Sequence, residues 1–374
     1  MSADITHDPI YNTVDRDDFM AMIDVERYAD RADAFDEIIS ATVDHFWDPT
    51  DASYIDFEAE PFDAREELIM PRDFTLELNC AVADRLDERQ QILLANESTR
   101  FSISSILHGE QGALSLSASL CHILRDPGAQ EYAANQTREE ARHVTAFAKY
   151  VHKRWGSPIA VGATLGRLMT ELVHAPEVYK KLVGMQMLIE GLAMGAFATI
   201  HAKTRDPLLR RLVQLVMTDE AFHHKFGKIW ADRTIPKLSA EEQNLVEDWA
   251  ATCFQTLLFN LVNAEQKQAI YPRFGLDWQW VRSAVLEAFT DEDRRQVMRQ
   301  STNIFRVLIK TLLKAGIITE RTKPVYAAWV DMEELRGESD EVVGSDIADA
   351  TVLELRDINA ARSRPISKAL KRAG

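Results

Sequence analysis

An internal repeat with an offset of 80 residues constrains the fold of this chain more than any other feature of its sequence. The matching positions are Glu110 with Glu190, Arg125-Asp126-Pro127 with Arg205-Asp206-Pro207, Glu140 with Glu220, and His143 with His223. Self-similarity at a fixed period indicates one structural unit used twice. Each unit reads as a helix, an Asp-Pro break and a second helix, because aspartate is a favoured N-cap and proline a favoured first helical residue. The repeat therefore predicts two helical hairpins.

The spacing within each hairpin predicts where its two glutamates lie. An α-helix rises 1.5 Å per residue, so Glu190 lies roughly 22 Å before the break near residue 205. Glu220 lies roughly 21 Å after the same break on the returning helix. The first copy, from Glu110 to Glu140, has nearly the same spacing. The two carboxylates of each hairpin are therefore expected at the same level.

The Glu-x-x-His spacing places two metal-binding side chains one turn apart on one helix face, so both reach a single ion. Glu110 and Glu190 lie on otherwise apolar helix stripes. Buried ionised carboxylates need cations or take up protons. Four carboxylates and two imidazoles suit a pair of divalent iron or manganese ions better than structural zinc. The repeat therefore predicts a dinuclear metal site.

Charge and cysteine content limit the remaining classes of function. The chain has 43 Lys and Arg against 59 Asp and Glu, a net charge of −16, which argues against binding nucleic acid. The cysteines Cys80, Cys121 and Cys253 form no C-x-x-C pair, and the acidic N-terminus lacks the pattern of a signal peptide. We expect a cytoplasmic protein.

Residues 182–200 form an apolar run long enough to span a membrane. Gln186 and Glu190 lie near its middle, and a carboxylate at the centre of a lone spanning helix is costly. A helix that is buried on all sides within a bundle has the same composition. We therefore predict no membrane span.

The helical pattern extends beyond the repeat. The middle of the chain has few alternating β-branched runs and few internal prolines, so we predict an all-α fold. The expected helices cover roughly residues 86–125, 129–154, 159–174, 177–203, 207–232, 240–270, 278–288 and 291–315.

The pattern of glutamates and histidines resembles the ferritin-like di-iron carboxylate superfamily, whose bundles supply one Glu from each of two helices and Glu-x-x-His from each of the other two. The resemblance covers about residues 90–232, includes the R2-like and bacterial monooxygenase-hydroxylase branches, and implies a four-helix bundle with two Fe ions (Fe2+/Fe3+) or a Mn/Fe pair. The metal ligands and catalytic residues that it implies are Glu110, Glu140, His143, Glu190, Glu220 and His223.

The resemblance extends to the acidic residue before each Glu-x-x-His glutamate. The doublets Glu139-Glu140 and Asp219-Glu220 are similar to those of bacterial multicomponent monooxygenase hydroxylases, where the first acid orients a ligand histidine. We therefore expect Glu139 and Asp219 to orient the ligand histidines.

Several branches of the superfamily differ from this chain at single positions. The radical tyrosine of ribonucleotide reductase small subunits falls on Phe147, and the additional histidine of arylamine N-oxygenases falls on Val216. The tyrosine–valine cross-link of R2-like ligand-binding oxidases falls on Met185 and Ala113. The threonine of the multicomponent hydroxylases falls on Met194, and the cysteine-rich module of rubrerythrins has no counterpart. These positions therefore do not support a stable tyrosyl radical or the other specialised chemistries, whereas an R2-like subunit that works without that tyrosine passes the comparison.

Small residues surround the two glutamates of the first helices. Glycine inside a helix costs about 1 kcal/mol relative to alanine, so their presence calls for an explanation. Close helix packing is one explanation, and a cavity for dioxygen and an apolar substrate is the other. The cavity would be lined by Phe147, Met187, Gly191, Met194 and Phe197.

Other histidines have simpler interpretations. A third Glu-x-x-His, at Glu171 and His174, lacks the acidic doublet and ends at a helix stop, which indicates surface or capping chemistry. His224 points away from the helix face of His223, so we expect it to support a ligand or to lie at an interface. We do not expect His108 to be a ligand.

The resemblance implies three regions and a class of reaction. We expect an extension over residues 1–85 packed on the bundle, a ferritin-like di-iron domain over 86–335, and a polar C-terminal tail over 336–374. The expected activity is that of an O2-activating di-iron oxidase or monooxygenase that hydroxylates, desaturates or N-oxygenates a mainly apolar small molecule. A ferroxidase or metal-handling protein and an R2-like radical-generating subunit remain alternatives. Electrons would come from a separate reductase or ferredoxin or from the substrate, and the resemblance implies a homodimer.

Overall fold

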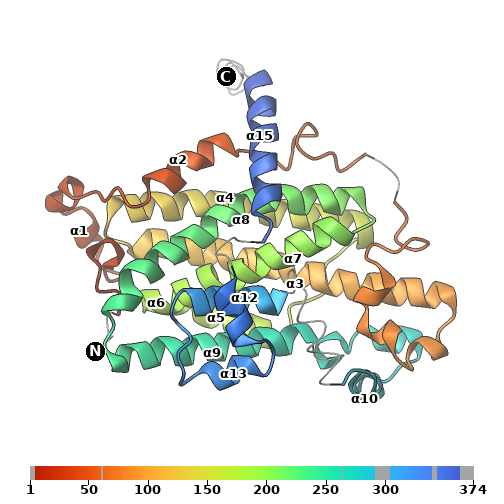
Figure 1. Cartoon of the computed structure of the whole chain (residues 1–374). Coiled ribbons are helices and arrows are strands. Elements are labelled where there is room, and N and C mark those ends of the chain that lie inside the picture. Colours follow the sequence, from red (N-terminus) through yellow and green to blue (C-terminus); the bar gives the residue numbers. More distant parts are fainter. Residues whose placement is uncertain (1–4, 60–61, 263, 291–303, 339–342, 363–374) are drawn as a thin grey trace.

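The computed structural model describes residues 5–59, 62–262, 264–290, 304–338 and 343–362. Within these ranges the chain is built from helices, and the one β-type contact is an isolated bridge between Thr13 and Leu124. The all-α prediction is confirmed. The structure is a ferritin-like four-helix bundle with additional N- and C-terminal helices (Figure 1).

The bundle consists of the two hairpins that the repeat predicts. The first pairs α3 (Glu88–Ile123) with α4 (Pro127–Trp155), and the second pairs α7 (Glu190–Lys203) with α8 (Pro207–Thr234). Asp126 and Asp206 cap the returning helices by accepting hydrogen bonds from the backbone N–H groups of Ala129 and Leu208. The Asp-Pro breaks therefore start α4 and α8, as predicted.

The helix predicted over 177–203 has an internal change in geometry. It begins as α6 (Val178–Lys181), continues as a π-helix over Leu182–Ile189 and becomes α7 at Glu190. The backbone N–H of Glu190 donates to the carbonyl of Met185, five residues earlier. This wider turn sets the position of Glu190, and the apolar periodicity of the sequence did not predict it.

The segment over Val178–Lys203 is long and apolar enough to cross a membrane by length and composition, but 67% of its most apolar window is buried inside the protein. It packs against α8, α9 (Ala240–Val262) and α12 (Ile304–Lys314). The prediction of a helix buried within a bundle accounts for its composition.

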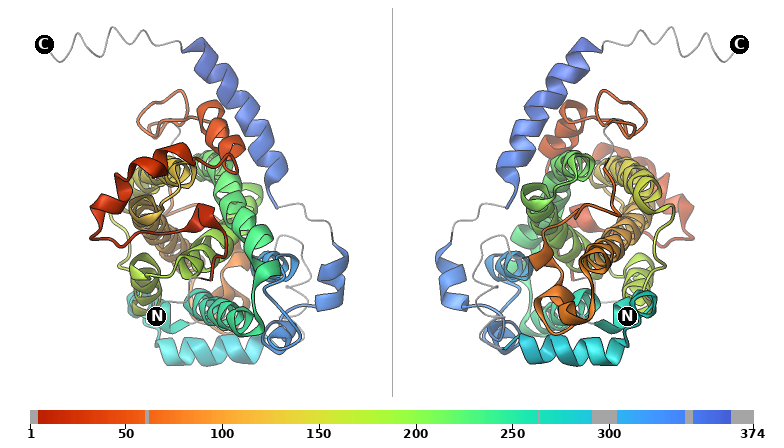
Figure 2. Two further views of the ribbon diagram at one scale, coloured as in Figure 1. Left: turned by 90° about the vertical axis from the view of Figure 1, so that its left-hand side faces the viewer. Right: turned by 90° about the vertical axis from the view of Figure 1, so that its right-hand side faces the viewer.

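Further helices cover the bundle on two sides, as Figure 2 shows in views nearly along its axis. On one side lie α5 (Ala163–His174), α9, α10 (Trp278–Ala288), α12, α13 (Lys323–Ala327) and α14 (Met332–Gly337). The predicted helix over 240–270 ends at Val262, eight residues early. Of the predicted helix over 291–315, residues 291–303 lie outside the described part of the chain and the remainder is α12.

The opposite side is covered by α2 (Asp36–Asp44) of the N-terminal segment and by the C-terminal helix α15 (Ser345–Ala361), whereas the turn over Leu76–Asn79 contacts α10. The N-terminal segment contains short helices: α1 (Phe19–Met22), α2 (Asp36–Asp44) and the 3-10 turns Pro9–Tyr11, Val25–Ala29, Arg72–Phe74, Leu76–Asn79 and Ala83–Arg85. Helix α2 packs on α4 and α8. This helix of the N-terminal segment therefore packs on the bundle, and the extension over 1–85 as a separate region stays a prediction.

The C-terminal tail is more ordered than its polar sequence suggests. Helix α15 lies against α8, with Thr351 and Leu355 fully buried, while Gln214 of α8 donates a hydrogen bond to Thr351. Its N-cap, Gly344, has φ +87° and lies against Met217 and Met194. The tail is thus partly an attached helix, and its boundary as a separate region stays a prediction.

Candidate metal centre

The six predicted ligands form two overlapping groups at the centre of the bundle. Glu110, Glu140, His143 and Glu220 offer ligand atoms that lie within 4.8 Å of one another, and so do Glu140, Glu190, Glu220 and His223. All six side chains are buried, with at most 5% of any residue exposed. Glu140 and Glu220 belong to both groups, which is the arrangement expected of carboxylates that bridge two ions.

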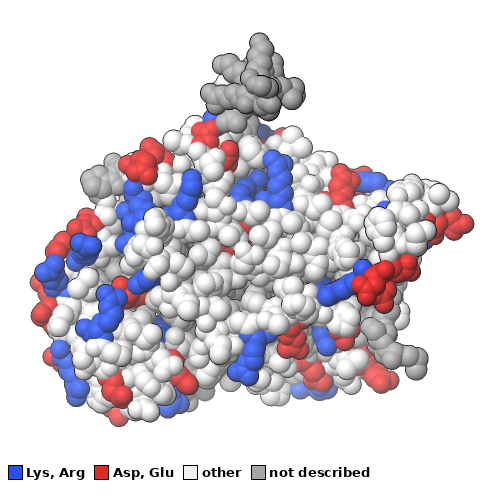
Figure 3. Space-filling model, turned by 180° about the vertical axis from the view of Figure 1, so that it is seen from behind, with Lys and Arg blue, Asp and Glu red and all other residues white. Residues whose placement is uncertain are grey.

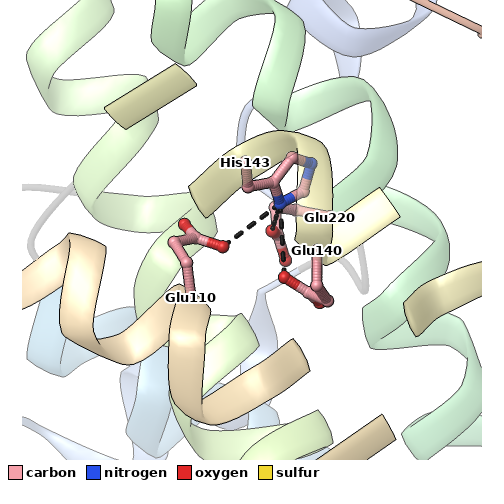
Figure 4. Close-up of side chains that lie close together, drawn as sticks. All are labelled: Glu110, Glu140, His143 and Glu220. Atoms are coloured by element: carbon pink, nitrogen blue, oxygen red, sulfur yellow. Dashed lines mark hydrogen bonds and ion pairs between the residues drawn. The ribbon is translucent and has the colours of Figure 1, made fainter. Parts of the chain in front are cut away.

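The first group converges on one nitrogen (Figure 4). Nδ1 of His143 lies 3.1 Å from Oε2 of Glu110, 3.2 Å from Oε1 of Glu220 and 3.3 Å from Oε2 of Glu140. One ring nitrogen can donate a single proton, so it cannot satisfy three carboxylates. A cation placed among these atoms would satisfy all of them.

The second group has the same form. Nδ1 of His223 lies 3.0 Å from Oε1 of Glu140 and 3.3 Å from Oε2 of Glu220. The remaining oxygens Oε2 of Glu140 and Oε1 of Glu220 are buried and make no hydrogen bond with the described residues. Glu190 joins this group from the end of the π-helical turn. Buried carboxylate oxygens normally have a hydrogen-bond donor, and oxygens that bind a metal ion lack one when the protein is considered without the ion.

The outer nitrogens of the two histidines are held by the predicted acids in a crossed arrangement. Nε2 of His143 lies 2.7 Å from Oδ2 of Asp219, and Nε2 of His223 lies 2.9 Å from Oε2 of Glu139. Each acid thus supports the histidine of the other hairpin. A carboxylate on one ring nitrogen fixes the tautomer and leaves the other nitrogen free to bind a metal.

Three residues that sequence analysis missed complete this support. His45 lies 3.0 Å from Glu139 and 3.3 Å from Asp219, Nε1 of Trp47 donates to Asp219 at 2.9 Å, and Nε of Arg142 donates to Asp219 at 3.0 Å. His45 and Trp47 come from the end of α2, more than 90 residues before the acids they contact. The sequence run "HFW" at 45–47 and the arginine beside His143 were the signals available.

The four buried carboxyl groups of the cluster differ in how readily they ionise when no metal ion is considered. Burial raises the pKa of Glu110 to about 8 and that of Glu190 well above its usual range. Burial also opposes ionisation of Glu140 and Glu220, but neighbouring histidines, His223 first, keep the pKa of both carboxyls below the usual value. Four carboxylates in a desolvated site cannot all ionise at low cost. Two divalent cations would neutralise all four charges, so the residues present fit a dinuclear metal centre.

Two buried amides border the second group. Nε2 of Gln136 lies 3.2 Å from Glu140 and 3.4 Å from Glu190, and Nε2 of Gln186 donates to Oε1 of Gln136 at 2.9 Å. Each glutamine lies four residues before a ligand glutamate, but the 80-residue repeat places Val216 and Ile106 at the corresponding positions, so the pair does not follow the symmetry of the hairpins. Sequence analysis did not assign them to the site.

The residues predicted to line a substrate cavity are all buried but do not form one cluster. Phe147 stacks on Phe197 with ring centroids 5.8 Å apart, and both belong with Met194 to an apolar cluster between α4, α7 and α8. Met187 belongs to a different cluster and lies beside Gly227. Gly191 faces α12. The cavity itself stays a prediction.

The histidines that were not expected to be ligands have other partners. Nδ1 of His174 lies 2.9 Å from the carbonyl of Thr170, one turn earlier, as expected for chemistry at a helix end. His108 makes a hydrogen bond of 2.9 Å with the carbonyl of Ile159. His224 is buried directly after His223 and hydrogen-bonds the backbone of Gln186.

Comparison with known proteins gives matches only among solved structures. No protein-family model and no curated protein matches the chain. A single-residue mutant of an R2-like ligand-binding oxidase with an aerobically reconstituted Mn/Fe cofactor is 12% identical, with 87% of this chain and 93% of that chain covered and a TM-score of 0.37. An R2-like ligand-binding oxidase with the same kind of cofactor, after a long soak, is 14% identical over 68% of this chain and 90% of that chain, with a TM-score of 0.38. The buried carboxylate–histidine cluster, not these likenesses, is the evidence for function.

Proposed function

We propose that the protein is an O2-activating oxidase or monooxygenase that holds two iron ions, or a Mn/Fe pair, and acts on a mainly apolar small molecule. The observation that supports this most directly is the sharing of Glu140 and Glu220 between two buried carboxylate–histidine groups. A structural zinc site is closed by four ligands, usually cysteine and histidine, whereas oxygen-rich shared ligands suit iron and manganese.

Each ligand has a separate task in this proposal. Glu140 and Glu220 would hold both ions, Glu110 would hold the ion on the His143 side, and Glu190 would hold the ion on the His223 side. When bound, the ions supply the one-electron chemistry that allows O2 to react with an organic substrate. The electron donor is proposed to be a separate protein or the substrate.

The surrounding chain positions the ligands and keeps water away. Glu139 and Asp219 keep the Nδ1 atoms of the two histidines aimed into the cluster. Gln136 donates to the carboxylate oxygens of Glu140 and Glu190 and limits their rotation. The stacked rings of Phe147 and Phe197 form an apolar wall between the helices, and an apolar wall favours reactions of apolar groups over hydrolysis.

The proposal is tested by metal stoichiometry in single variants. The purified protein should bind two Fe(II) ions per chain without oxygen. Glu110→Ala should weaken the ion on the His143 side, Glu190→Ala the ion on the His223 side, and Glu220→Ala both. Glu171→Ala is the matched control, because Glu171 belongs to the third Glu-x-x-His and lies exposed outside the cluster. Two tightly bound ions in all three ligand variants would overturn the proposal.

A further inference from the structure

A second group of polar atoms lies beside the proposed metal cluster, on the side that faces α12. His224 follows the ligand His223 on α8, and Gly191 follows the ligand Glu190 on α7. Consecutive residues of an α-helix point about 100° apart, so His224 and Gly191 face away from the ions while staying within one residue of their ligands. Leu308 and Thr311 of α12 lie opposite Gly191.

His224 presents an unpaired ring nitrogen in this place. The residue is only 7% exposed, and its Nδ1 makes no hydrogen bond with any described residue. The imidazole also lies against the backbone of Gln186 in the π-helical segment. A histidine ring nitrogen donates or accepts a hydrogen bond according to the tautomer, so Nδ1 can pair with a group that does both.

Gly191 leaves room in front of that nitrogen. A Cβ added to Gly191 would lie 3.8 Å from Cδ2 of Leu308, 3.8 Å from Oγ1 of Thr311 and 4.0 Å from Nδ1 of His224. These are ordinary contact distances, so a methyl-sized group fits, and neither the backbone nor a neighbour requires glycine. An atom about 1 Å closer to the two polar atoms would be within hydrogen-bond distance of both.

The two polar atoms restrict what can bind. Nδ1 of His224 and the hydroxyl of Thr311 can each donate or accept a hydrogen bond. A hydroxyl or an amino group, which also does both, can pair with the two atoms together. Leu308 provides an apolar contact for the adjoining carbon atom.

We propose that His224, Thr311 and Gly191 form a binding site for the hydroxyl or amino group of a small, otherwise apolar substrate. The inference rests on the proposed function for the identity of the ligand as a substrate. It assigns the substrate a hydroxyl or amino group that is bound next to Glu190 and His223, the proposed metal ligands.

The test follows the Nδ1 resonance of 15N-labelled His224 in the full chain, with and without diamagnetic Zn(II), while n-butanol is added. 1-Fluorobutane has a similar size but no hydrogen to donate, and serves as the control ligand. Thr311→Val removes the hydroxyl at constant shape, and Gly191→Ala fills the space with a better helix former. Gly109→Ala is the matched control, since a Cβ there meets no atom within 4 Å and the residue adjoins Glu110 instead.

We expect n-butanol to move the Nδ1 resonance of His224 and 1-fluorobutane to leave it unchanged. Thr311→Val should weaken n-butanol binding at least fivefold, Gly191→Ala at least tenfold, and Gly109→Ala should leave it unchanged. The inference would be overturned if n-butanol left the resonance unmoved. It would also be overturned if the Thr311 and Gly191 variants bound n-butanol as tightly as the wild-type protein does. The spectra without metal report n-butanol binding at this site alone, whereas metal stoichiometry reports the binding of two ions. Failure of this site is therefore distinguished from failure of the proposed function.

Discussion

Asp219 on α8 supports His143 on α4, with Oδ2 of Asp219 2.7 Å from Nε2 of His143. The reciprocal contact joins Glu139 on α4 to His223 on α8 at 2.9 Å. Each hairpin therefore orients the metal-binding histidine of the other. Loss of either acid should consequently affect the ion on the opposite hairpin.

This crossing predicts a specific pattern of metal affinity. Asp219→Asn should weaken the ion bound by His143, and Glu139→Gln should weaken the ion bound by His223, each by about 10–100-fold, because an orienting carboxylate contributes on that scale. Competition of Fe(II) with a chelator measures both affinities. Asp232→Asn on the exposed face of α8 is the control. Weakening at the histidine of the same hairpin would contradict the crossed arrangement.

Removal of Arg142 should destabilise the protein strongly. Its guanidinium is 8% exposed and bonds the fully buried carboxylate of Asp219. Arg142→Met leaves this carboxylate without its fixed cation, and breaking a buried ion pair costs about 3–5 kcal/mol. Urea unfolding of the metal-free protein measures the loss. Lys228→Met, which breaks an exposed pair with Asp232, should cost at most about 1 kcal/mol, and equal losses in the two variants would refute the argument.

Glu77 should make part of the stability dependent on pH. Burial alone would raise the pKa of this carboxyl, but Lys267 and the hydroxyl of Tyr271 hold it below its usual value. A carboxyl with a lowered folded pKa adds stability above its unfolded pKa, about 4.3, and loses it as the pH falls through the folded pKa. The difference in unfolding free energy between wild type and Glu77→Gln should therefore be constant near pH 7 and shrink below about pH 4.

Gly227 should be required for the packing of α8 against the π-helical segment. An added Cβ would lie 2.9 Å from Cβ of Gln186 and 3.2 Å from its backbone carbon. Gly227→Ala should cost about 1–3 kcal/mol by overpacking, despite the better helix propensity of alanine. Thermal unfolding compares it with Gly109→Ala, where the Cβ meets open space. A neutral Gly227→Ala would show that the two helices separate easily at this point.

The sequence predicted the parts of the site that depend on local spacing. The ligands Glu140 and His143 lie one helical turn apart, and the 80-residue offset places the second set at the same level, so periodicity suffices. The roles of Glu139 and Asp219 followed from the resemblance, but the crossing of their contacts required the packing of α4 against α8.

Other parts could not be predicted, for identifiable physical reasons. His45 and Trp47 reach the acids from the end of α2, and no sequence periodicity records so distant a contact. The π-helix before Glu190 arises from hydrogen-bond register, which apolar composition does not specify. Met187, predicted near Phe147, packs in another cluster because the wider π-turn changes which face each side chain occupies.

Figure 3 shows acidic and basic side chains mixed around the edge of one face, with a broad area of uncharged residues between them. Acidic residues outnumber basic ones in the chain as a whole, which has a net charge of −16.

The most direct measurement is an anaerobic Fe(II) titration of the metal-free protein, followed by one pulse of O2 under optical and Mössbauer observation. The proposed centre predicts two ions per chain that become an antiferromagnetically coupled diferric pair. Binding of one ion or none, or two ferric ions without magnetic coupling, would contradict a shared site at Glu140 and Glu220.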